Sequence, residues 1–367
     1  MTQPIYEKLV DAVGMRGGGA PGIKGPELYT LMEELFTPEE AELAVKMPLN
    51  PVSAADLASA IGRSAEEVEQ MLETMANKGL VFSNERGGVI FYSLMALAPG
   101  MFEFQFTKGE VNERTKRLAR LFDDYFNVMM PAIEKAGRKA ALFPAARVVS
   151  VEQEVPAGFE VYPYNLVSHY IDKSQHLAVS ICYCRHHGEL VGRPCDKPKD
   201  VCMSFGPAAK FTIERGFGRA VSKKEAQEIL KRAEKAGLVH CSSNTSKYLD
   251  FICNCCSCHC GFLQSIKNAA IPNMVATSGF IVSLEEGDCS GCGDCVEMCP
   301  VDALAMEEDV VALNLKRCIG CGLCVSACST GALRLEPREG APVPPRDRHE
   351  LDAAMISSLG QLGDKAQ

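Results

Sequence analysis

The sequence lacks the features of a secreted or membrane-spanning protein. No run of about 18 consecutive apolar residues occurs, so no segment is predicted to span a bilayer as a helix. The first residues, MTQPIYEKLVDAVGMRGGG, contain no basic region followed by an apolar stretch, so no secretory signal is visible. Together these absences predict a cytoplasmic protein.

An excess of positive charge is also absent. Lysine and arginine number 38 against 47 aspartates and glutamates, which gives a formal net charge of -9. This balance argues against a broad surface for nucleic acid or anionic lipid. No Walker loop, nucleophile triad or credible dinucleotide-binding loop is present, which favours a chain without substrate chemistry of its own. Flavin and corrinoid sites, which often leave no short signature, stay open.

Cysteine is absent from the first 181 residues and abundant afterwards. All 18 cysteines lie between Cys182 and Cys328. A cytoplasmic chain is not expected to carry structural disulfides, because thiols are kept reduced there. Thiols separated by one to three residues are better explained as metal ligands.

The last eight cysteines form two runs of identical spacing, CSGCGDCVEMCP and CIGCGLCVSACS. Both read C-x2-C-x2-C-x3-C, and the second repeats the first at an offset of 29 residues, from Cys289 to Cys318. Three thiolates on a tight glycine-containing loop can bind three irons of one cubane, and the fourth cysteine of each run binds the other cluster. We therefore predict two [4Fe-4S] clusters, the first bound by Cys289, Cys292, Cys295 and Cys328. The second is bound by Cys318, Cys321, Cys324 and Cys299. Zinc fits eight evenly repeated cysteines without histidine poorly.

This segment resembles the bacterial two-[4Fe-4S] ferredoxin. The resemblance implies a small α+β unit whose two clusters exchange electrons, with one-electron transfer as its activity. Pro300 follows the first run as in that family, whereas Ser329 follows the second, a departure that concerns the loop shape and potential of one cluster.

Residues 279–336 carry ten acidic and three basic side chains, a net charge of -7. Such a field speeds encounter with an oppositely charged protein. We therefore expect a partner oxidoreductase or electron carrier with a basic docking face. A solvated acidic surface without a partner is the alternative.

Ten cysteines precede the paired runs, and their spacing matches no common zinc finger. They predict at least one further iron–sulfur cluster, with candidate ligands Cys182, Cys184, Cys195, Cys202, Cys253, Cys255, Cys256, Cys258 and Cys260. Structural zinc is the alternative, and its candidate ligands then include His186, His187 and His259. The C-x-x-C-H match to a c-type haem site at 255–259 is attributed to cysteine density, since haem c is normally attached outside the cytoplasm. This segment resembles cysteine-rich modules of multidomain iron–sulfur proteins of anaerobes.

The cysteine-free half predicts ordered helices and one hairpin. Capping boxes are expected at Thr37 and Ser64, and two apolar runs around Gly87-Gly88 predict a hairpin. A helix is also expected after Ser222, with a buried stripe formed by Ala226, Ile229, Leu230 and Ala233. Residues 27–95 resemble a winged-helix domain. Its candidate recognition helix carries Glu66, Glu67, Glu69 and Glu73, so protein contact is favoured over DNA binding.

The length of 367 residues predicts several folded units, and the fold class expected is α+β, multidomain. We predict a winged-helix-like domain over residues 1–100 and a helical connector over 101–150. A cysteine-rich metal or iron–sulfur domain with α/β elements follows over 151–278, then a ferredoxin-like two-cluster domain over 279–337. A proline-rich linker and a C-terminal helix occupy 338–367.

The sequence is compatible with three functions. The leading one is an iron–sulfur electron-transfer component of an oxidoreductase system, which relays single electrons to or from a partner. The first alternative is an iron–sulfur redox-sensing transcription regulator that uses the winged helix. The second is a reductase with a substrate-binding cluster in the middle domain.

Overall fold

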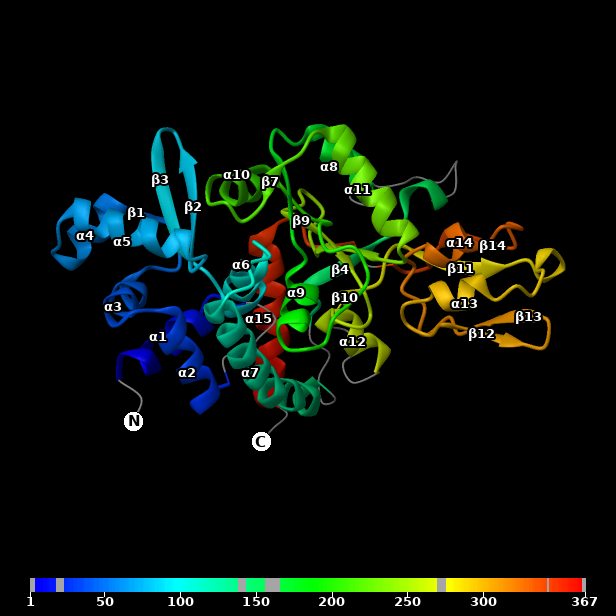
Figure 1. The fold of residues 1–367 in the computed structure, drawn as a ribbon, viewed down its shortest axis with the longest axis horizontal. Coiled ribbons are helices and arrows are strands. Elements are labelled where there is room, and N and C mark those ends of the chain that lie inside the picture. The colour runs from blue at the N-terminus through cyan, green and yellow to red at the C-terminus, as the bar shows by residue number, and fades with distance from the viewer. Residues whose placement is uncertain are drawn as a thin grey trace. The chain divides into compact units, whose positions relative to one another are not determined.

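The computed structural model describes residues 4–17, 23–137, 143–155, 166–268, 275–341 and 343–364. Helices and strands are mixed throughout (Figure 1). The chain divides into two units. The first, here called the N-terminal unit, contains Met1–Ile133, Tyr183–Pro194 and Phe211–Arg219. The second, the cysteine-rich unit, contains Glu134–Cys182, Cys195–Lys210 and Ala220–Gln367.

The N-terminal unit is mainly helical. Its helices are α1 (Pro4–Gly14), α2 (Pro26–Leu35), α3 (Pro38–Lys46), α4 (Ala54–Ile61), α5 (Ala65–Asn77), α6 (Phe102–Phe106), most of α7 (Glu113–Gly137) and α9 (Tyr183–Leu190). A three-stranded antiparallel sheet has the order β1 (Val52–Ser53), β3 (Val89–Leu94), β2 (Val81–Arg86).

Local signals explain most of these elements. Thr37 forms the predicted capping box with Glu40, and Pro38 occupies the first turn of α3. The predicted hairpin is confirmed, because Gly87 and Gly88 both adopt positive φ between β2 and β3. The capping box predicted at Ser64 is wrong: its exposed side chain makes no cap hydrogen bond, although α5 still begins there.

The cysteine-rich unit is built on a mixed sheet of order β10-β4-β8-β9-β6-β5-β7. These strands are β4 (Ala146–Val149), β5 (Leu177–Ser180), β6 (Cys202–Phe205), β7 (Arg219–Ala220), β8 (Val239–Ser243), β9 (Phe251–Cys255) and β10 (Val275–Ala276), and only Ala220 of β7 belongs to this unit. Strands β8 and β9 are antiparallel, and their register places Cys241 opposite Cys253. Cys253 and Cys255 share one face of β9, because side chains alternate along a strand.

Helices of this unit include α8 (Val167–Lys173), α11 (Lys223–Lys235), α12 (Gly261–Lys267) and α15 (Arg348–Asp364), and α10 (Gly206–Glu214) is divided between the two units. Helix α11 begins at the predicted cap, Ser222, whose hydroxyl accepts the Glu225 N–H. The predicted apolar stripe of α11 is buried. No described helix is long and apolar enough to cross a membrane.

The C-terminal part of this unit repeats one small motif twice. Its elements are β11 (Phe280–Leu284), α13 (Asp294–Met298), β12 (Leu304–Glu307), β13 (Val310–Leu313), α14 (Leu323–Ala327) and β14 (Leu333–Pro337), the yellow-to-orange segment of Figure 1. Strand β11 pairs with β14, and β12 pairs with β13, both antiparallel. One hydrophobic core contains side chains of this segment together with Val148 and Val239 of the mixed sheet.

Candidate metal centres

The two cysteine runs form glycine-rich loops that each lead into a five-residue helix, α13 or α14. Gly291, Gly293, Gly320 and Gly322 all have positive φ, so the loops repeat the same backbone conformation at the sequence offset. A Cβ atom on Gly320 would lie 2.1 Å from the carbonyl oxygen of Phe280, and one on Gly291 would lie 2.6 Å from that of Asp309. Only glycine therefore fits these two positions without a shift of the loop.

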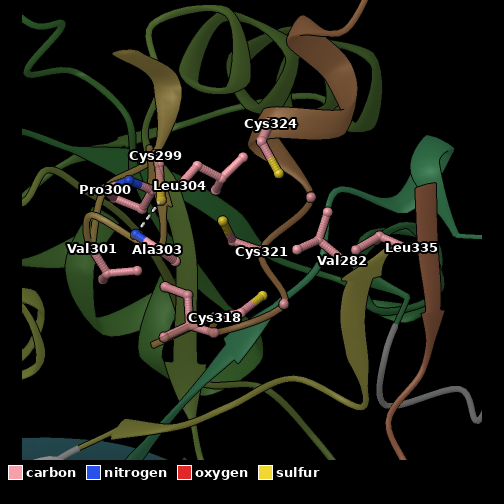
Figure 2. A pocket seen from close by; sticks show the side chains of 13 residues that line it. Val282, Cys299, Pro300, Val301, Ala303, Leu304, Cys318, Cys321, Cys324 and Leu335 are labelled. Atoms are coloured by element: carbon pink, nitrogen blue, oxygen red, sulfur yellow. Dashed lines mark hydrogen bonds between the residues drawn. The ribbon is translucent and has the colours of Figure 1, made fainter. Parts of the chain in front are cut away.

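One pocket brings cysteines of the two runs together. Its lining contains Cys318, Cys321 and Cys324 of the second run and Cys299 of the first. In Figure 2 these side chains face the same space, next to the apolar groups of Val282, Leu304 and Leu335. The structure thus places the fourth cysteine of the first run beside the first three of the second.

The other four cysteines of the paired runs also lie near one another. Burial raises the pKa of the Cys295 thiol, and the nearby Cys292, Cys328 and Cys289 side chains raise it further against the effect of a backbone hydrogen bond. In the pocket of Figure 2, burial raises the pKa of Cys321 to about 12, with Cys299 and Cys318 adding to the effect. Crowded buried thiols of this kind release their protons when a metal takes their place, because the metal stabilises the thiolate.

Hydrogen bonds fix the second cysteine loop to the rest of the unit. The carbonyl oxygen of Gly320 accepts from the hydroxyls of Ser150 and Ser278, both at 2.7 Å. The Val151 N–H donates to the carbonyl oxygen of Cys321 at 2.8 Å. The position of this loop is therefore set by residues that flank strands β4 and β11.

A second group of thiols lies on the mixed sheet or next to it and is here called the sheet thiols: Cys202, Cys241, Cys253 and Cys255 in the strands, with Cys182 after β5 and Cys260 before α12. Cys255 is buried, and hydrogen-bonding contacts with Cys241, Cys253 and Cys260, together with burial, raise its pKa well above the usual thiol value. Contacts with Cys182 and Cys253, and burial, do the same for Cys202. Cys253 contacts both Cys202 and Cys255, so the six thiols form one connected group.

A third group is here called the turn site: Cys256, Cys258 and His259 lie in the turn between β9 and α12, and Cys195 reaches them from the loop before β6. One ligand atom from each lies within 4.8 Å of every other. The Sγ atoms of Cys195 and Cys258 are 3.7 Å apart, and the His259 Nδ1 atom is 3.2 Å from the Cys258 Sγ atom.

The structure therefore divides the nine ligands predicted in the middle segment between the sheet thiols, the turn site and helix α9. Cys182, Cys202, Cys253, Cys255 and Cys260 belong to the sheet thiols, whereas Cys195, Cys256 and Cys258 belong to the turn site. Cys184 lies on α9 of the N-terminal unit and is half-buried.

The histidines considered as zinc ligands also divide. The Nε2 atoms of His186 and His187 contact the carbonyl oxygens of Glu110 and Ala119 at 2.9 and 3.0 Å, within the N-terminal unit. Only His259 of the three lies in a described group of thiols.

Sequence reasoning left Cys241 out of the ligand set. It lies alone in its segment, and only the pairing of β8 with β9 brings it to Cys253 and Cys255. The available signal was the strand-like run Val239–Ser243, which predicts a neighbour of β9 without giving the register.

Comparison with known families matches residues 288–332 to the 4Fe-4S dicluster domain. This match covers the paired runs and supports a ferredoxin-type, metal-binding domain near the C-terminus. Comparisons with curated proteins and with solved structures find no match.

Proposed function

We propose that this chain is an electron-transfer protein that passes single electrons through two [4Fe-4S] clusters to or from a partner oxidoreductase. The observation that carries the proposal is the meeting of Cys299 with Cys318, Cys321 and Cys324 in one pocket. Four thiols drawn from both runs are the donor set of a ferredoxin-type cubane. The first cluster is assigned to Cys289, Cys292, Cys295 and Cys328 on the same reasoning.

The residues around the pocket fit this role. The Ala303 N–H lies 3.2 Å from the Cys299 Sγ atom, and hydrogen bonds to the sulfurs are among the factors that set a cluster's potential. Apolar neighbours such as Val282 and Leu304 limit the access of water. A bound cluster supplies reversible exchange of one electron, and the protein fixes its ligands and their surroundings.

We propose that the sheet thiols hold a further iron–sulfur centre, with zinc as the alternative. Several of these sulfurs are in direct contact, which suits a centre in which one iron binds two thiolates, as in a [2Fe-2S] cluster held by four cysteines. Cys241 and Cys255 belong to the same hydrophobic core as Cys321 and Cys324. Cys241 is also near enough to Cys321 to raise its pKa. This proximity supports electron transfer between a centre at the sheet thiols and the clusters of the paired runs.

The docking partner is proposed to be basic and to meet the chain in the cytoplasm. The partner is proposed to dock on the acidic segment 279–336 of this chain, where Glu307, Glu308 and Asp309 are exposed at the β12–β13 hairpin. The N-terminal unit is proposed to contact protein rather than DNA through its winged-helix-like part, because Glu66, Glu67 and Glu69 of α5 are exposed.

Single-cysteine variants test the ligand assignment. Cys299→Ala and Cys321→Ala are expected to remove the same EPR signal of the reduced protein, although their cysteines come from different runs. Cys328→Ala and Cys292→Ala are expected to remove the other signal. If Cys299→Ala instead removed the same EPR signal as Cys292→Ala, each cluster would be bound by a single run, and the proposed exchange of the fourth cysteine between the runs would be refuted.

A further inference from the structure

We infer that the turn site is a mononuclear zinc site with three thiolate ligands and one imidazole ligand, separate from the electron-transfer centres. Its ligands are the Sγ atoms of Cys195, Cys256 and Cys258 and the Nδ1 atom of His259. The inference is independent of the proposed electron transfer, because it rests on a different set of side chains.

The distances distinguish one metal ion from a cubane. Tetrahedral zinc with bonds of about 2.3 Å to sulfur and 2.0 Å to nitrogen requires donor atoms about 3.5 to 3.8 Å apart. The observed separations are 3.7 Å for Cys195 Sγ to Cys258 Sγ, 3.2 Å for Cys258 Sγ to His259 Nδ1, and 3.9 Å for Cys256 Sγ to the same nitrogen. These three separations lie on both sides of the range that zinc requires, and every other pair of ligand atoms lies within 4.8 Å.

The same structure contains an internal comparison. Cys299, Cys318, Cys321 and Cys324 surround a pocket, as expected for thiolates that bind four different irons. At the turn site every ligand atom lies within 4.8 Å of the other three, which leaves room for a single ion. The ligand types agree, since three cysteines and one histidine are a common structural zinc set.

Hydrogen bonds of the backbone and of one side chain hold three of these ligands in a single turn. The Cys260 N–H donates to the carbonyl oxygen of Cys256 at 3.1 Å, which closes the turn that carries Cys256, Cys258 and His259. The Gln264 side-chain amide donates to the carbonyl oxygen of Cys258 at 2.6 Å and ties the turn to α12. Three ligands thus come from one short turn.

The fourth ligand comes from a distant part of the chain. Cys195 lies in the loop before β6, 63 positions before Cys258. Zinc bound here would join that loop to the start of α12, next to Cys255 and Cys260 of the sheet thiols. Because Zn²⁺ has no redox chemistry, we assign it a structural role: it holds the turn that follows β9.

Metal analysis of the full chain, purified without oxygen, tests this inference. We expect about one zinc ion per chain in addition to iron, with zinc-edge X-ray absorption showing three sulfur ligands at about 2.3 Å and one nitrogen near 2.0 Å. Cys258→Ser is expected to lose most of the zinc and to keep the iron content and the EPR signals. His259→Cys preserves a four-ligand set and is expected to retain zinc with four sulfur ligands.

A matched control separates this site from the clusters. Cys292 is also an exposed cysteine, but it belongs to the first paired run. Cys292→Ser is expected to lower iron and leave zinc unchanged, the reverse of Cys258→Ser. Protein without zinc, zinc that stays in Cys258→Ser, or iron in place of zinc at the turn site would each overturn the inference, whatever the result for electron transfer.

Discussion

Replacement of Gly320 by alanine should selectively damage one of the two proposed clusters. Gly320 has a φ of +70°, and a Cβ atom there would lie 2.1 Å from the Phe280 carbonyl oxygen and 2.2 Å from the Ser278 hydroxyl. The loop must therefore shift, and its shift removes the ligand geometry of the Cys318, Cys321 and Cys324 thiols. The cluster that these thiols share with Cys299 is the one expected to be lost.

The magnitude follows from two contributions. Left-handed backbone costs a non-glycine residue about 1–2 kcal/mol. Displacement of the loop also breaks the buried hydrogen bonds from Ser150 and Ser278 to the Gly320 carbonyl oxygen, at about 1 kcal/mol each. Gly320→Ala should therefore lower the free energy of unfolding by about 3–4 kcal/mol.

Gly293→Ala is the matched control, because Gly293 has a φ of +82° but no atom within 4 Å of an added Cβ. It should cost only the backbone contribution, about 1–2 kcal/mol. The difference of about 2 kcal/mol corresponds to roughly 30-fold in the unfolding equilibrium. The assay is loss of visible absorbance in guanidinium under anaerobic conditions, with iron counted and EPR recorded before denaturation. If the two variants lowered the free energy of unfolding equally, or if Gly320→Ala lost the cluster assigned to Cys289, the close approach at Gly320 would not be what holds the second cysteine loop.

Three further predictions concern other parts of the molecule. Arg215→Ala should lower the free energy of unfolding by about 2 kcal/mol, measured by thermal melting, because Arg215 hydrogen bonds to Glu73 and to Ser83. Hydrogen bonding to Arg215 lowers the pKa of Glu73, so stability from this pair is present above pH 4.5 and lost as the pH falls further. Glu73→Gln should remove that part of the pH dependence, and an unchanged profile would contradict it. Electron transfer to a basic redox protein, followed by stopped flow, should slow as the Debye length shrinks from about 30 Å at 0.01 M to 3 Å at 1 M salt, whereas a flat response would exclude electrostatic docking.

Periodic patterns and turn residues were sufficient to predict individual elements. The apolar spacing after Ser222 gave helix α11 with its buried face, and Gly87-Gly88 gave the β2–β3 hairpin. Both depend on contacts between neighbours in the sequence. The cap at Ser64 failed because Ser and Glu at the right spacing permit a capping box without requiring one, and solvent can satisfy the same groups.

The candidate sites show where sequence reasoning stops. The paired runs carry their spacing within the sequence, so a ferredoxin-type segment could be predicted there before the fold was known, and the family match at residues 288–332 supports it. The middle cysteines could not be divided, because Cys241 reaches Cys253 only through strand register and Cys195 reaches Cys258 only through tertiary folding. Spacing along the chain gives no information on such long-range contacts.

The binding of two [4Fe-4S] clusters by the paired runs is tested most directly by an iron and acid-labile sulfide count on anaerobically purified protein, followed by EPR during stepwise reduction. Two [4Fe-4S] clusters require at least about eight irons and eight sulfides per chain, with two signals that appear as single electrons are added. Iron above this number would place a further centre at the sheet thiols. Colourless protein with zinc alone, or with free thiols at the paired runs, would exclude iron–sulfur clusters at these cysteines.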